Sequence, residues 1–181
     1  MEEKTVVLTI QDGVGLIRLN RPQVYNAINR QLAEELTATL QKVNEDPKVR
    51  AVVLTGEGKA FCSGQDLNDR SAIVTKGDEI SLGESVRSRY NPLIQAIMDL
   101  KKPVIAAVNG VAAGAGCSLA LACDLRVITP RTRFVEAFVR IGLAPDSGSS
   151  YFLPRLVGLG RALEIAMTGR DVEAEEAVRI G

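Results

Sequence analysis

Residues 103–124 read PVIAAVNGVAAGAGCSLALACD, an apolar run, a glycine-rich turn and a second apolar run in immediate succession. The run 104–108 is typical of a buried strand, and residues 117–121 predict a helix that leads away from the Gly-Ala-Gly turn at 114–116. A helix that starts directly after such a turn points unpaired backbone N–H groups and the positive end of its dipole into one small space. The stretch therefore predicts either a phosphate site or a site that stabilises an oxygen becoming negative during a reaction.

The composition is that of one globular domain without a strong charge bias. The chain has 181 residues, of which 46% are hydrophobic, and 22 basic residues balance 22 acidic ones. This balance gives no electrostatic reason to expect nucleic acid or an anionic membrane as a partner. The N-terminus lacks the order of a signal peptide, and the apolar runs are too short to cross a bilayer. A cytoplasmic location is therefore predicted.

Histidine is absent, which restricts the chemistry. Ser-His-Asp and Cys-His catalysis are excluded, and a zinc site is not expected because only scattered cysteines and carboxylates remain as ligands. Cys62, Cys117 and Cys123 form no CxxC pair and are expected to be reduced, mostly buried thiols. Proton transfer must then fall to carboxylates, lysine, tyrosine or cysteine.

The rest of the chain predicts a repeated strand–turn–helix order. Two β-rich runs, 5–10 and 15–20, flank Asp12-Gly13 and predict a hairpin, and Asn29 can cap a helix that ends before Pro47. The helix would bury one face along Leu32, Leu36, Leu40 and Val43. Further strands are expected at 49–55, 125–129 and 134–138, and helices at 84–100 (bent or shifted by Pro92), 151–156, 161–167 and 174–180.

The glycine turn does not fit a nucleotide site well. A dinucleotide fingerprint needs a third small residue where this chain has Leu119, and no Lys-Ser/Thr pair follows the turn. The loop 60–67, AFCSGQDL, offers a second feature of the same kind, because Gly64 can free the backbone to present the N–H of Gln65. Either loop alone favours a simple tight turn. The two together favour an oxyanion hole, in which two N–H groups hold one carbonyl oxygen.

Asp146 lies in the segment IGLAPDSG at 141–148, after an apolar stretch and before a helix start. The simpler interpretation is that Asp146 caps the helix beginning near Ser149 or makes an Asx turn. The functional interpretation is a carboxylate in an apolar surrounding, whose pKa desolvation raises toward neutral pH. On the residues alone, the capping interpretation is favoured.

Four stretches together resemble the enoyl-CoA hydratase/isomerase (crotonase) family. They are LNRPQVYNAIN (19–29), VRAVVLTGEGKAFCSGQDL (49–67), KPVIAAVNGVAAGAGCSLALACDLRV (102–127) and FVRIGLAPDSGSSYFLPRLVG (138–158). The resemblance implies an α/β fold, a spiral of ββα units with flanking helices, with residues 1–181 as a single crotonase-like core domain. It also implies that the chain stops before a C-terminal helical part that covers the active site and supports homotrimers or dimers of trimers.

The resemblance places the two oxyanion-hole donors at the backbone N–H groups of Gln65 and Ala115. It implies an acyl-CoA thioester as the substrate, with no cofactor beyond the coenzyme A that the substrate carries and no metal. The acyl group would be selected by residues 68–83. The residues implied in substrate binding are Gly64, Gln65, Asp66, Leu67, Asn68, Gly114, Gly116 and Phe138.

The departures from the family pattern concern the carboxylates. Hydratases of this family use two glutamates, and the matching positions here are Ser118 and Phe138. An acid stands instead at Asp146, a pattern that resembles the ring-1,2-epoxyphenylacetyl-CoA isomerases of aerobic phenylacetate breakdown. The resemblance thus implies an isomerase in which Asp146 shuttles one proton. The alternatives are a Δ3,Δ2-enoyl-CoA isomerase of fatty acid metabolism, an enoyl-CoA hydratase, or a non-catalytic CoA-binding or assembly module.

Overall fold

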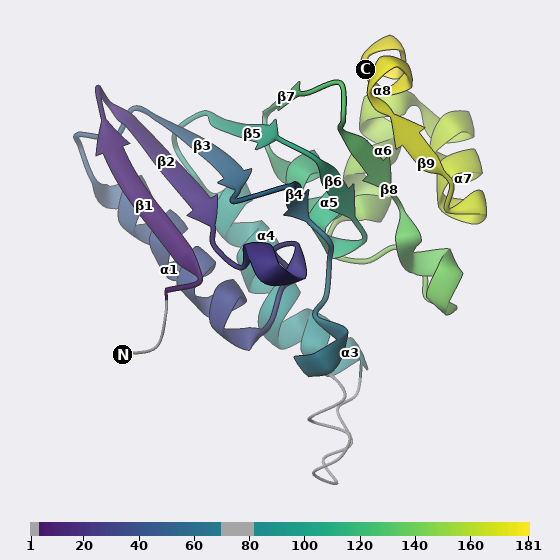
Figure 1. The fold of residues 1–181 in the computed structure, drawn as a ribbon, viewed down its shortest axis with the longest axis horizontal. Coiled ribbons are helices and arrows are strands. Elements are labelled where there is room, and N and C mark those ends of the chain that lie inside the picture. Colours follow the sequence, from purple (N-terminus) through teal and green to yellow (C-terminus); the bar gives the residue numbers. More distant parts are fainter. Residues whose placement is uncertain (1–3, 70–81) are drawn as a thin grey trace, which may run out of the picture.

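The computed structural model describes residues 4–69 and 82–181, and it begins with the predicted hairpin (Figure 1). Strand β1 (Val6–Gln11) pairs antiparallel with β2 (Val14–Leu19). Asp12 and Gly13 make the turn with φ of 52° and 83°. Two positive φ values in succession are typical of the two-residue turns that match the twist of a hairpin, which is why Asp-Gly is a strong signal for one.

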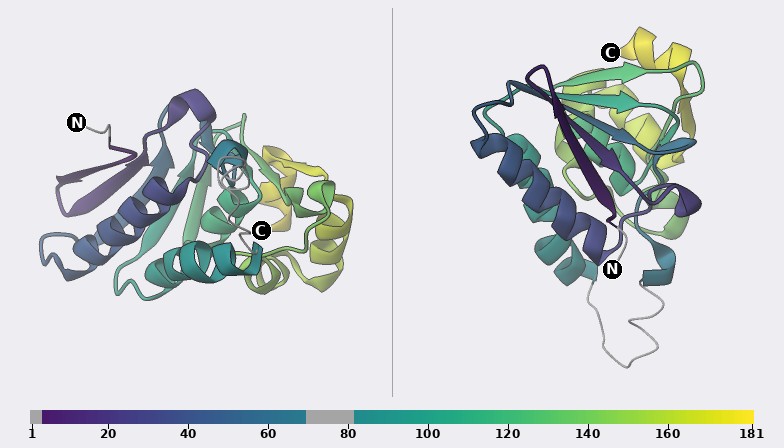
Figure 2. Two further views of the ribbon diagram at one scale, coloured as in Figure 1. Left: turned by 90° about the horizontal axis from the view of Figure 1, so that it is seen from below. Right: turned by 60° about the vertical axis from the view of Figure 1, so that its left-hand side comes forward.

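Five strands form the larger sheet, in the order β1-β2-β3-β5-β7. Strands β3 (Ala51–Gly56), β5 (Val104–Val108) and β7 (Leu125–Ile128) extend β2 in parallel. Parallel neighbours need crossover connections, and helices supply them. Figure 2 shows α1 and α4 side by side across one face of this sheet.

Helix α1 (Arg30–Glu45) follows the short 3-10 helix η1 (Pro22–Val24) and forms as expected. The Asn29 side chain accepts a hydrogen bond of 2.9 Å from the Leu32 N–H, which satisfies one of the free donors at the helix start. The apolar stripe of α1 is fully buried against the sheet. It consists of Leu32, Leu36, Leu40 and Val43, each at 0% exposure.

A second sheet has the order β4-β6-β8-β9 and is built from short strands. They are β4 (Ala60–Cys62), β6 (Val111–Ala113), β8 (Arg133–Val135) and β9 (Asp171–Glu173). Strands β4, β6 and β8 each follow a strand of the larger sheet, so the chain repeats a long strand, a short strand and a helical segment. This spiral confirms the expected ββα units. The strand expected at 134–138 ends at Val135, because residues 137–141 form a 3-10 turn, η3 (Ala137–Ile141).

The helix expected over 84–100 is interrupted. It consists of α3 (Leu82–Ser85), a π-helical turn η2 (Val86–Tyr90) and α4 (Asn91–Met98). Pro92 occupies the first turn of α4, and it has no N–H to donate to the preceding turn of this continuous helical stretch. The adjustment to Pro92 is therefore made by the wide turn directly before it.

Of the remaining helices, α6 (Ser149–Val157), α7 (Leu159–Thr168) and α8 (Ala174–Ile180) lie at the C-terminal end of the chain, and α5 (Ala115–Ala122) lies further inside the molecule (Figure 1). Helix α5 leads from β6 toward β7. Helices α6 and α7 pack with α5 through a second apolar cluster, and α8 follows β9. None of the helices within the described ranges combines the length and the apolar character that a membrane crossing requires.

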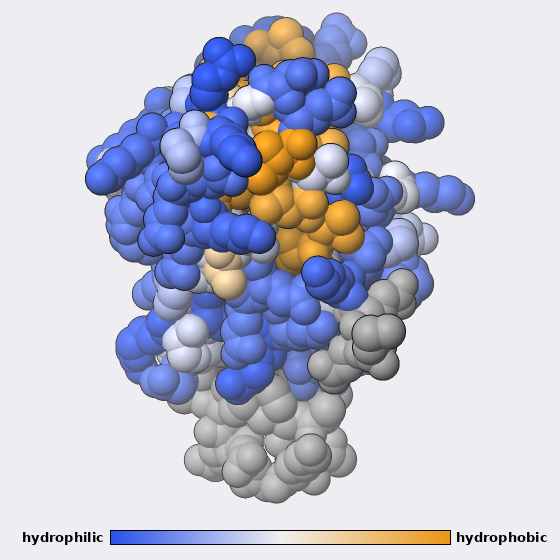
Figure 3. Space-filling model, turned by 90° about the vertical axis from the view of Figure 1, so that its left-hand side faces the viewer, coloured by the Kyte–Doolittle hydropathy of each residue, from blue (hydrophilic) through white to orange (hydrophobic). Residues whose placement is uncertain are grey.

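The larger sheet leaves its second face partly uncovered. Strand register places Leu16, Val53, Ile105 and Leu125 in one row, while the alternate residues Ile17, Val52 and Ala106 face the core. Figure 3, seen from the side of β1, shows apolar residues gathered together and bordered by polar ones.

Candidate active site

Two neighbouring strands of the second sheet bring the two predicted loops together. Strands β4 and β6 are parallel, with Ala60 opposite Val111 and Cys62 opposite Ala112. Because parallel strands end at the same edge of a sheet, the loops that follow them leave side by side. A β-carbon at Gly64 would lie 2.8 Å from the Ala113 carbonyl oxygen and 3.6 Å from the Ala115 nitrogen. Only a glycine permits this approach, and the φ of 94° at Gly64 requires one as well.

The backbone around Gln65 directs its N–H away from the neighbouring segment. The Ile28 N–H donates to the Gly64 carbonyl at 2.7 Å, and the Asp66 N–H donates to the Ile28 carbonyl at 3.0 Å. The Gly64 carbonyl and the Gln65 N–H belong to one trans peptide group and therefore point in opposite directions. Because the carbonyl points toward Ile28, the Gln65 N–H faces away from it. No residue of the described ranges accepts a backbone hydrogen bond from it.

Ala115 offers the second donor. It is the first residue of α5, and the N–H groups of a first helical turn have no acceptor within the helix. Its N-cap, Gly114, has φ 50° and ψ −124° and supplies no side-chain cap. A β-carbon at Gly116 would collide with the Cys62 carbonyl group, so this glycine allows α5 to begin directly against β4. The N-terminus of a fully buried helix thus adds its positive dipole end at the Ala115 N–H.

Asp146 and Gln65 line the same cavity of about 70 Å³, together with Ser85, Val86, Tyr90, Leu143 and Ala144. Burial raises the pKa of the Asp146 carboxyl, and a hydrogen bond of 2.8 Å from the Ser147 hydroxyl partly opposes that rise. A half-buried carboxylate with a raised pKa holds a proton more readily than a free aspartate and is suited to accept and return one. The functional interpretation of Asp146 therefore has a geometric basis.

The capping interpretation of Asp146 is wrong. Helix α6 begins at Ser149 with Gly148 as its N-cap, and no side chain caps it. Asp146 contributes its backbone carbonyl, which accepts from the Ser149 N–H at 2.9 Å. The Asp146 carboxylate has one hydrogen-bond partner among the described residues, the adjacent Ser147 hydroxyl.

Ser118 and Phe138 occupy the two positions at which the similar hydratases carry glutamates, so neither position supplies a carboxylate here. Ser118 is fully buried on α5, and its hydroxyl lies 3.3 Å from the carbonyl oxygens of both Gly114 and Asp146. Phe138 is buried on η3 and does not line the 70 Å³ cavity. Within the described ranges, Asp146 is the one carboxylate that lines this cavity.

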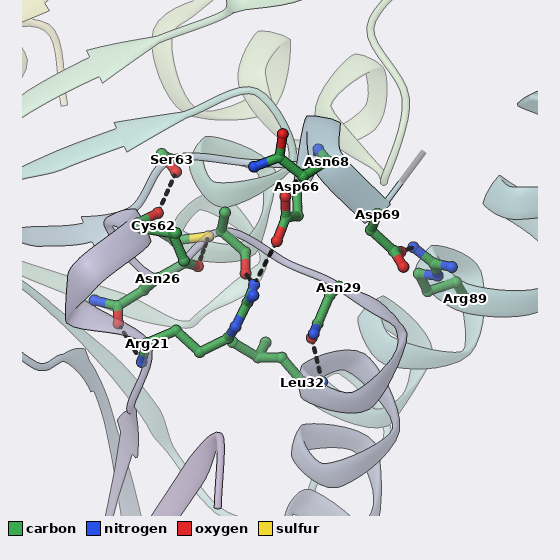
Figure 4. A network of polar contacts seen from close by, with 12 residues as sticks. Arg21, Asn26, Asn29, Leu32, Cys62, Ser63, Asp66, Asn68, Asp69 and Arg89 are labelled. Carbon is green, nitrogen blue, oxygen red and sulfur yellow. Dashed lines mark hydrogen bonds and ion pairs between the residues drawn. The ribbon is translucent and has the colours of Figure 1, made fainter. Parts of the chain in front are cut away.

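An ion pair fixes the loop that presents Gln65. The Arg21 guanidinium lies 2.8 Å from the Asp66 carboxylate and donates to the Ala27 carbonyl at 2.6 Å. The Asn68 N–H donates to the other Asp66 oxygen at 3.0 Å, and Figure 4 shows the Arg21 side chain reaching Asp66, with Asn68 beside it. Both oxygens of the Asp66 carboxylate are thus engaged within the protein, so any contact of Asp66 with the substrate would not use a free carboxylate. Leu67 and Asn68 are exposed beside it, and their substrate contacts stay predictions.

Two polar residues were missed by the sequence analysis. Tyr90 ends η2 and lines the cavity with Asp146. Glu136 is buried between β8 and η3, where the Ser149 hydroxyl donates to it at 2.6 Å and burial raises the pKa of its carboxyl. Glu136 lines a different, mainly apolar cavity of about 360 Å³ beside α6 and α8. An acid between Val135 and Ala137 was the available signal for Glu136, and Tyr90 had none beyond its residue type.

The three cysteines are buried and unpaired, as expected. Burial raises the pKa of both Cys62 and Cys123 to about 12, so neither thiol is a nucleophile at neutral pH. In the parts of the chain that the structure describes, no cluster of histidine, cysteine or acidic residues could hold a metal ion. Residues 70–81 of the segment expected to select the acyl group lie outside the described residues.

Residues 9–181 match the family model described as "Enoyl-CoA hydratase/isomerase". The chain belongs to the enoyl-CoA hydratase/isomerase family. Two solved structures superpose on this chain. One, described as an enoyl-CoA hydratase/isomerase from Mycobacterium abscessus, has a TM-score of 0.92 at 40% identity and covers 97% of this chain and 68% of that one. The other, described as an enoyl-CoA hydratase from Streptomyces coelicolor, has a TM-score of 0.90 at 42% identity and covers 99% of this chain and 66% of that one. These superpositions confirm the crotonase fold.

The curated relatives of this chain carry the names of several activities. A "probable enoyl-CoA hydratase" of Rhodobacter capsulatus is 46% identical over the whole chain and 68% of its own length. The 1,2-epoxyphenylacetyl-CoA isomerase of Escherichia coli is 45% identical over 93% of this chain and 64% of its own length. A 4-chlorobenzoyl coenzyme A dehalogenase of an Arthrobacter species is 40% identical over 94% of this chain and 61% of its own length. The chain thus spans about two thirds of these relatives.

Proposed function

We propose that this protein is an acyl-CoA isomerase that forms an enolate of its thioester substrate and moves one proton with Asp146. The observation that supports this most directly is the cavity shared by Gln65 and Asp146, in which no second carboxylate is found among the described residues. One carboxylate can remove a proton from one carbon atom and return it to another. Hydration of a double bond by two glutamates has no counterpart here, since Ser118 and Phe138 occupy those positions.

The backbone donors would carry the electrostatic part of the reaction. The thioester oxygen is held between the N–H groups of Gln65 and Ala115 and gains negative charge as the enolate forms. Donors aimed in advance at such an oxygen stabilise the transition state, and loss of one donor typically slows the reaction by about 10²–10³-fold. The start of α5 behind Ala115 adds the favourable dipole.

The acyl group that fits this scheme best is a ring-1,2-epoxyphenylacetyl group. The similarity to the Escherichia coli isomerase supports this choice, as does the lone acid at Asp146. A 3-enoyl-CoA is a second substrate class, because it needs only the same proton transfer. No further cofactor is required in either case, and the coenzyme A belongs to the substrate. A trimeric assembly in the cytoplasm is part of the same proposal.

The test is Asp146→Asn in the full-length protein, assayed on a 3-enoyl-CoA and on the ring epoxide thioester in deuterated water. The wild type should turn over and incorporate deuterium into the product. The variant should lose about 10²–10⁴-fold in rate, the usual contribution of a positioned acid–base group. Asp99→Asn is the matched control, because Asp99 lies at the end of α4 with an exposed hydrogen bond to Gln95.

Three outcomes separate the alternatives. Undiminished activity of Asp146→Asn contradicts the proposed mechanism. Hydration of crotonyl-CoA by the wild type, without isomerisation of either substrate, favours a hydratase. Binding of acetyl-CoA without any turnover favours a non-catalytic CoA-binding module.

A further inference from the structure

Tyr90 places a polar group inside the candidate active site that the proposed mechanism does not use. It is the last residue of the π-helical turn η2 and is only 4% exposed. It lines the 70 Å³ cavity together with Asp146 and Gln65. Single π-helical turns within helices are frequent at functional sites, because they re-aim side chains relative to a regular helix.

The Tyr90 hydroxyl hydrogen has no acceptor in the described part of the chain. The adjacent Arg89 guanidinium faces the hydroxyl oxygen, but it can only donate hydrogen bonds and so cannot accept this hydrogen. A buried polar group without a partner destabilises the folded state by about 1–3 kcal/mol, and such groups are rare in native proteins. The neighbouring Arg89 guanidinium is engaged by the Asp69 carboxylate at 2.7 Å. An unused donor that borders a cavity can be satisfied by a water molecule in the free protein and by a ligand atom that displaces this water on binding.

The Tyr90 hydroxyl remains a donor under ordinary conditions. Burial is the largest cause that raises its pKa, and the nearby Cys62 and Asp146 act in the same direction, while Arg89 opposes the rise. The phenol is therefore protonated throughout the physiological range. It can offer its hydrogen to an acceptor but does not give it up.

The size of the cavity limits what the acceptor can be. The cavity has a volume of about 70 Å³, and on the same measure one water needs about 10–15 Å³. The cavity therefore takes a few atoms of the acyl group beside Asp146 rather than a whole acyl chain. The thioester oxygen is already assigned to the Gln65 and Ala115 N–H groups. Within the proposed function, an acceptor that the substrate supplies to Tyr90 is then another oxygen of the acyl group.

We infer that the Tyr90 hydroxyl donates a hydrogen bond to an oxygen substituent of the acyl group, close to the carbon atoms on which Asp146 acts. This inference rests on the proposed acyl-CoA isomerase function and makes Tyr90 a specificity-determining residue. Acyl groups that carry an epoxide, hydroxyl or keto oxygen at this place satisfy the donor. Plain hydrocarbon chains leave it unpaired, so the site selects against them.

Two stable thioesters that differ by one oxygen atom test the inference directly. Phenylacetyl-CoA and 2-hydroxyphenylacetyl-CoA are titrated by calorimetry into the full-length wild type, Tyr90→Phe and, as the matched control, Tyr151→Phe. Tyr151 is an exposed tyrosine on α6, so its hydroxyl is removed outside the cavity. We expect the wild type and Tyr151→Phe to prefer the hydroxylated thioester by roughly 5- to 100-fold, the ratio that corresponds to one satisfied buried donor.

Tyr90→Phe should bind both thioesters with nearly equal affinity. A preference that is unchanged in Tyr90→Phe overturns the inference. An equal loss of affinity for both thioesters also overturns it, because that result would make Tyr90 a structural wall of the cavity. If the wild type binds neither thioester, the acyl-CoA site itself is contradicted, and the proposed function falls together with the inference.

Discussion

The side-chain hydroxyl of Ser118 lies 3.3 Å from the backbone carbonyl oxygen of Asp146. The helix that follows the glycine turn is thereby joined to the loop that carries the lone acid, although 28 positions separate the two residues in the chain. The same hydroxyl also lies 3.3 Å from the Gly114 carbonyl oxygen. Ser118 therefore connects the donor side and the acid side of the site through backbone atoms, and its hydroxyl is directed away from proton transfer.

Replacing Ser118 by alanine should change stability more than chemistry. The variant loses the hydroxyl, whose single hydrogen is shared between the Gly114 and Asp146 carbonyl groups, which predicts a loss of about 0.5–1.5 kcal/mol in the free energy of unfolding, measured by urea denaturation. Isomerase turnover should stay close to that of the wild type, because Asp146 keeps its carboxylate. A fall in rate comparable to that of Asp146→Asn would show that Ser118 takes part in the reaction.

Because of Asp146, the rate of the reaction should increase with pH while the free energy of unfolding decreases. The folded state raises the pKa of this carboxyl through burial, so the carboxylate needed as a base forms only as pH rises through that higher value. The folded state also binds the proton more tightly than the unfolded state, so this group lowers stability as pH rises from the ordinary aspartate pKa through the raised one.

Asp146→Asn should therefore be more stable than the wild type at neutral pH and lose this advantage in acid. Thermal unfolding of both proteins across pH 3 to about 8, a range that spans ordinary and raised carboxyl pKa values, measures the difference. The kcat/KM of the wild type should rise with pH as the pH passes through the raised pKa of Asp146. Equal stability of the two proteins at every pH would contradict the burial effect on Asp146.

Gly64→Ala should damage the oxyanion hole. The new β-carbon would lie 2.8 Å from the Ala113 carbonyl oxygen, and the φ of 94° is unfavourable for alanine. We expect the two loops to separate and the turnover to fall by about 10²–10³-fold, as on loss of one donor. Gly58→Ala is the control. Gly58 lies in the turn between β3 and β4 and also has a positive φ of 79°, but a β-carbon there would contact Pro22 instead of the loop that follows β6. An equal loss of rate in both variants would assign the effect to general strain.

Sequence patterns predicted the elements whose signals are local. The Asp12-Gly13 hairpin and the stripe of α1 from Leu32 to Val43 depend on neighbouring residues, and both form as expected. The three-residue strands β4, β6 and β9 were not predicted, because so short a run carries no detectable alternation. Their pairing is nevertheless what sets the loops of Gly64 and Gly114 side by side.

The site shows the same division. Glycine spacing and the resemblance to the family pointed to Gln65, Ala115 and Asp146, and the structure places Gln65 and Asp146 on one cavity. The residues alone favour a capping role for Asp146, because an aspartate shortly before a helix often caps it. Only the three-dimensional structure shows that α6 begins one residue after Gly148, which occupies the cap instead. Tyr90 could not be found, because an unsatisfied hydroxyl is a property of the packed molecule and leaves no mark in the sequence.

The Arg21–Asp66 pair should be the most costly single contact to break near the site. The two side chains are 15% and 9% exposed, and both also bind backbone groups. Removing one partner of a buried pair leaves an uncompensated charge, so Arg21→Met should lower the free energy of unfolding by about 3–5 kcal/mol. The exposed Arg133–Asp171 pair supplies the control, because Arg133→Met should cost no more than about 1 kcal/mol. Urea denaturation of both variants measures the contrast, and similar losses in the two would mean that the loop carrying Gln65 is held by its packing rather than by this ion pair.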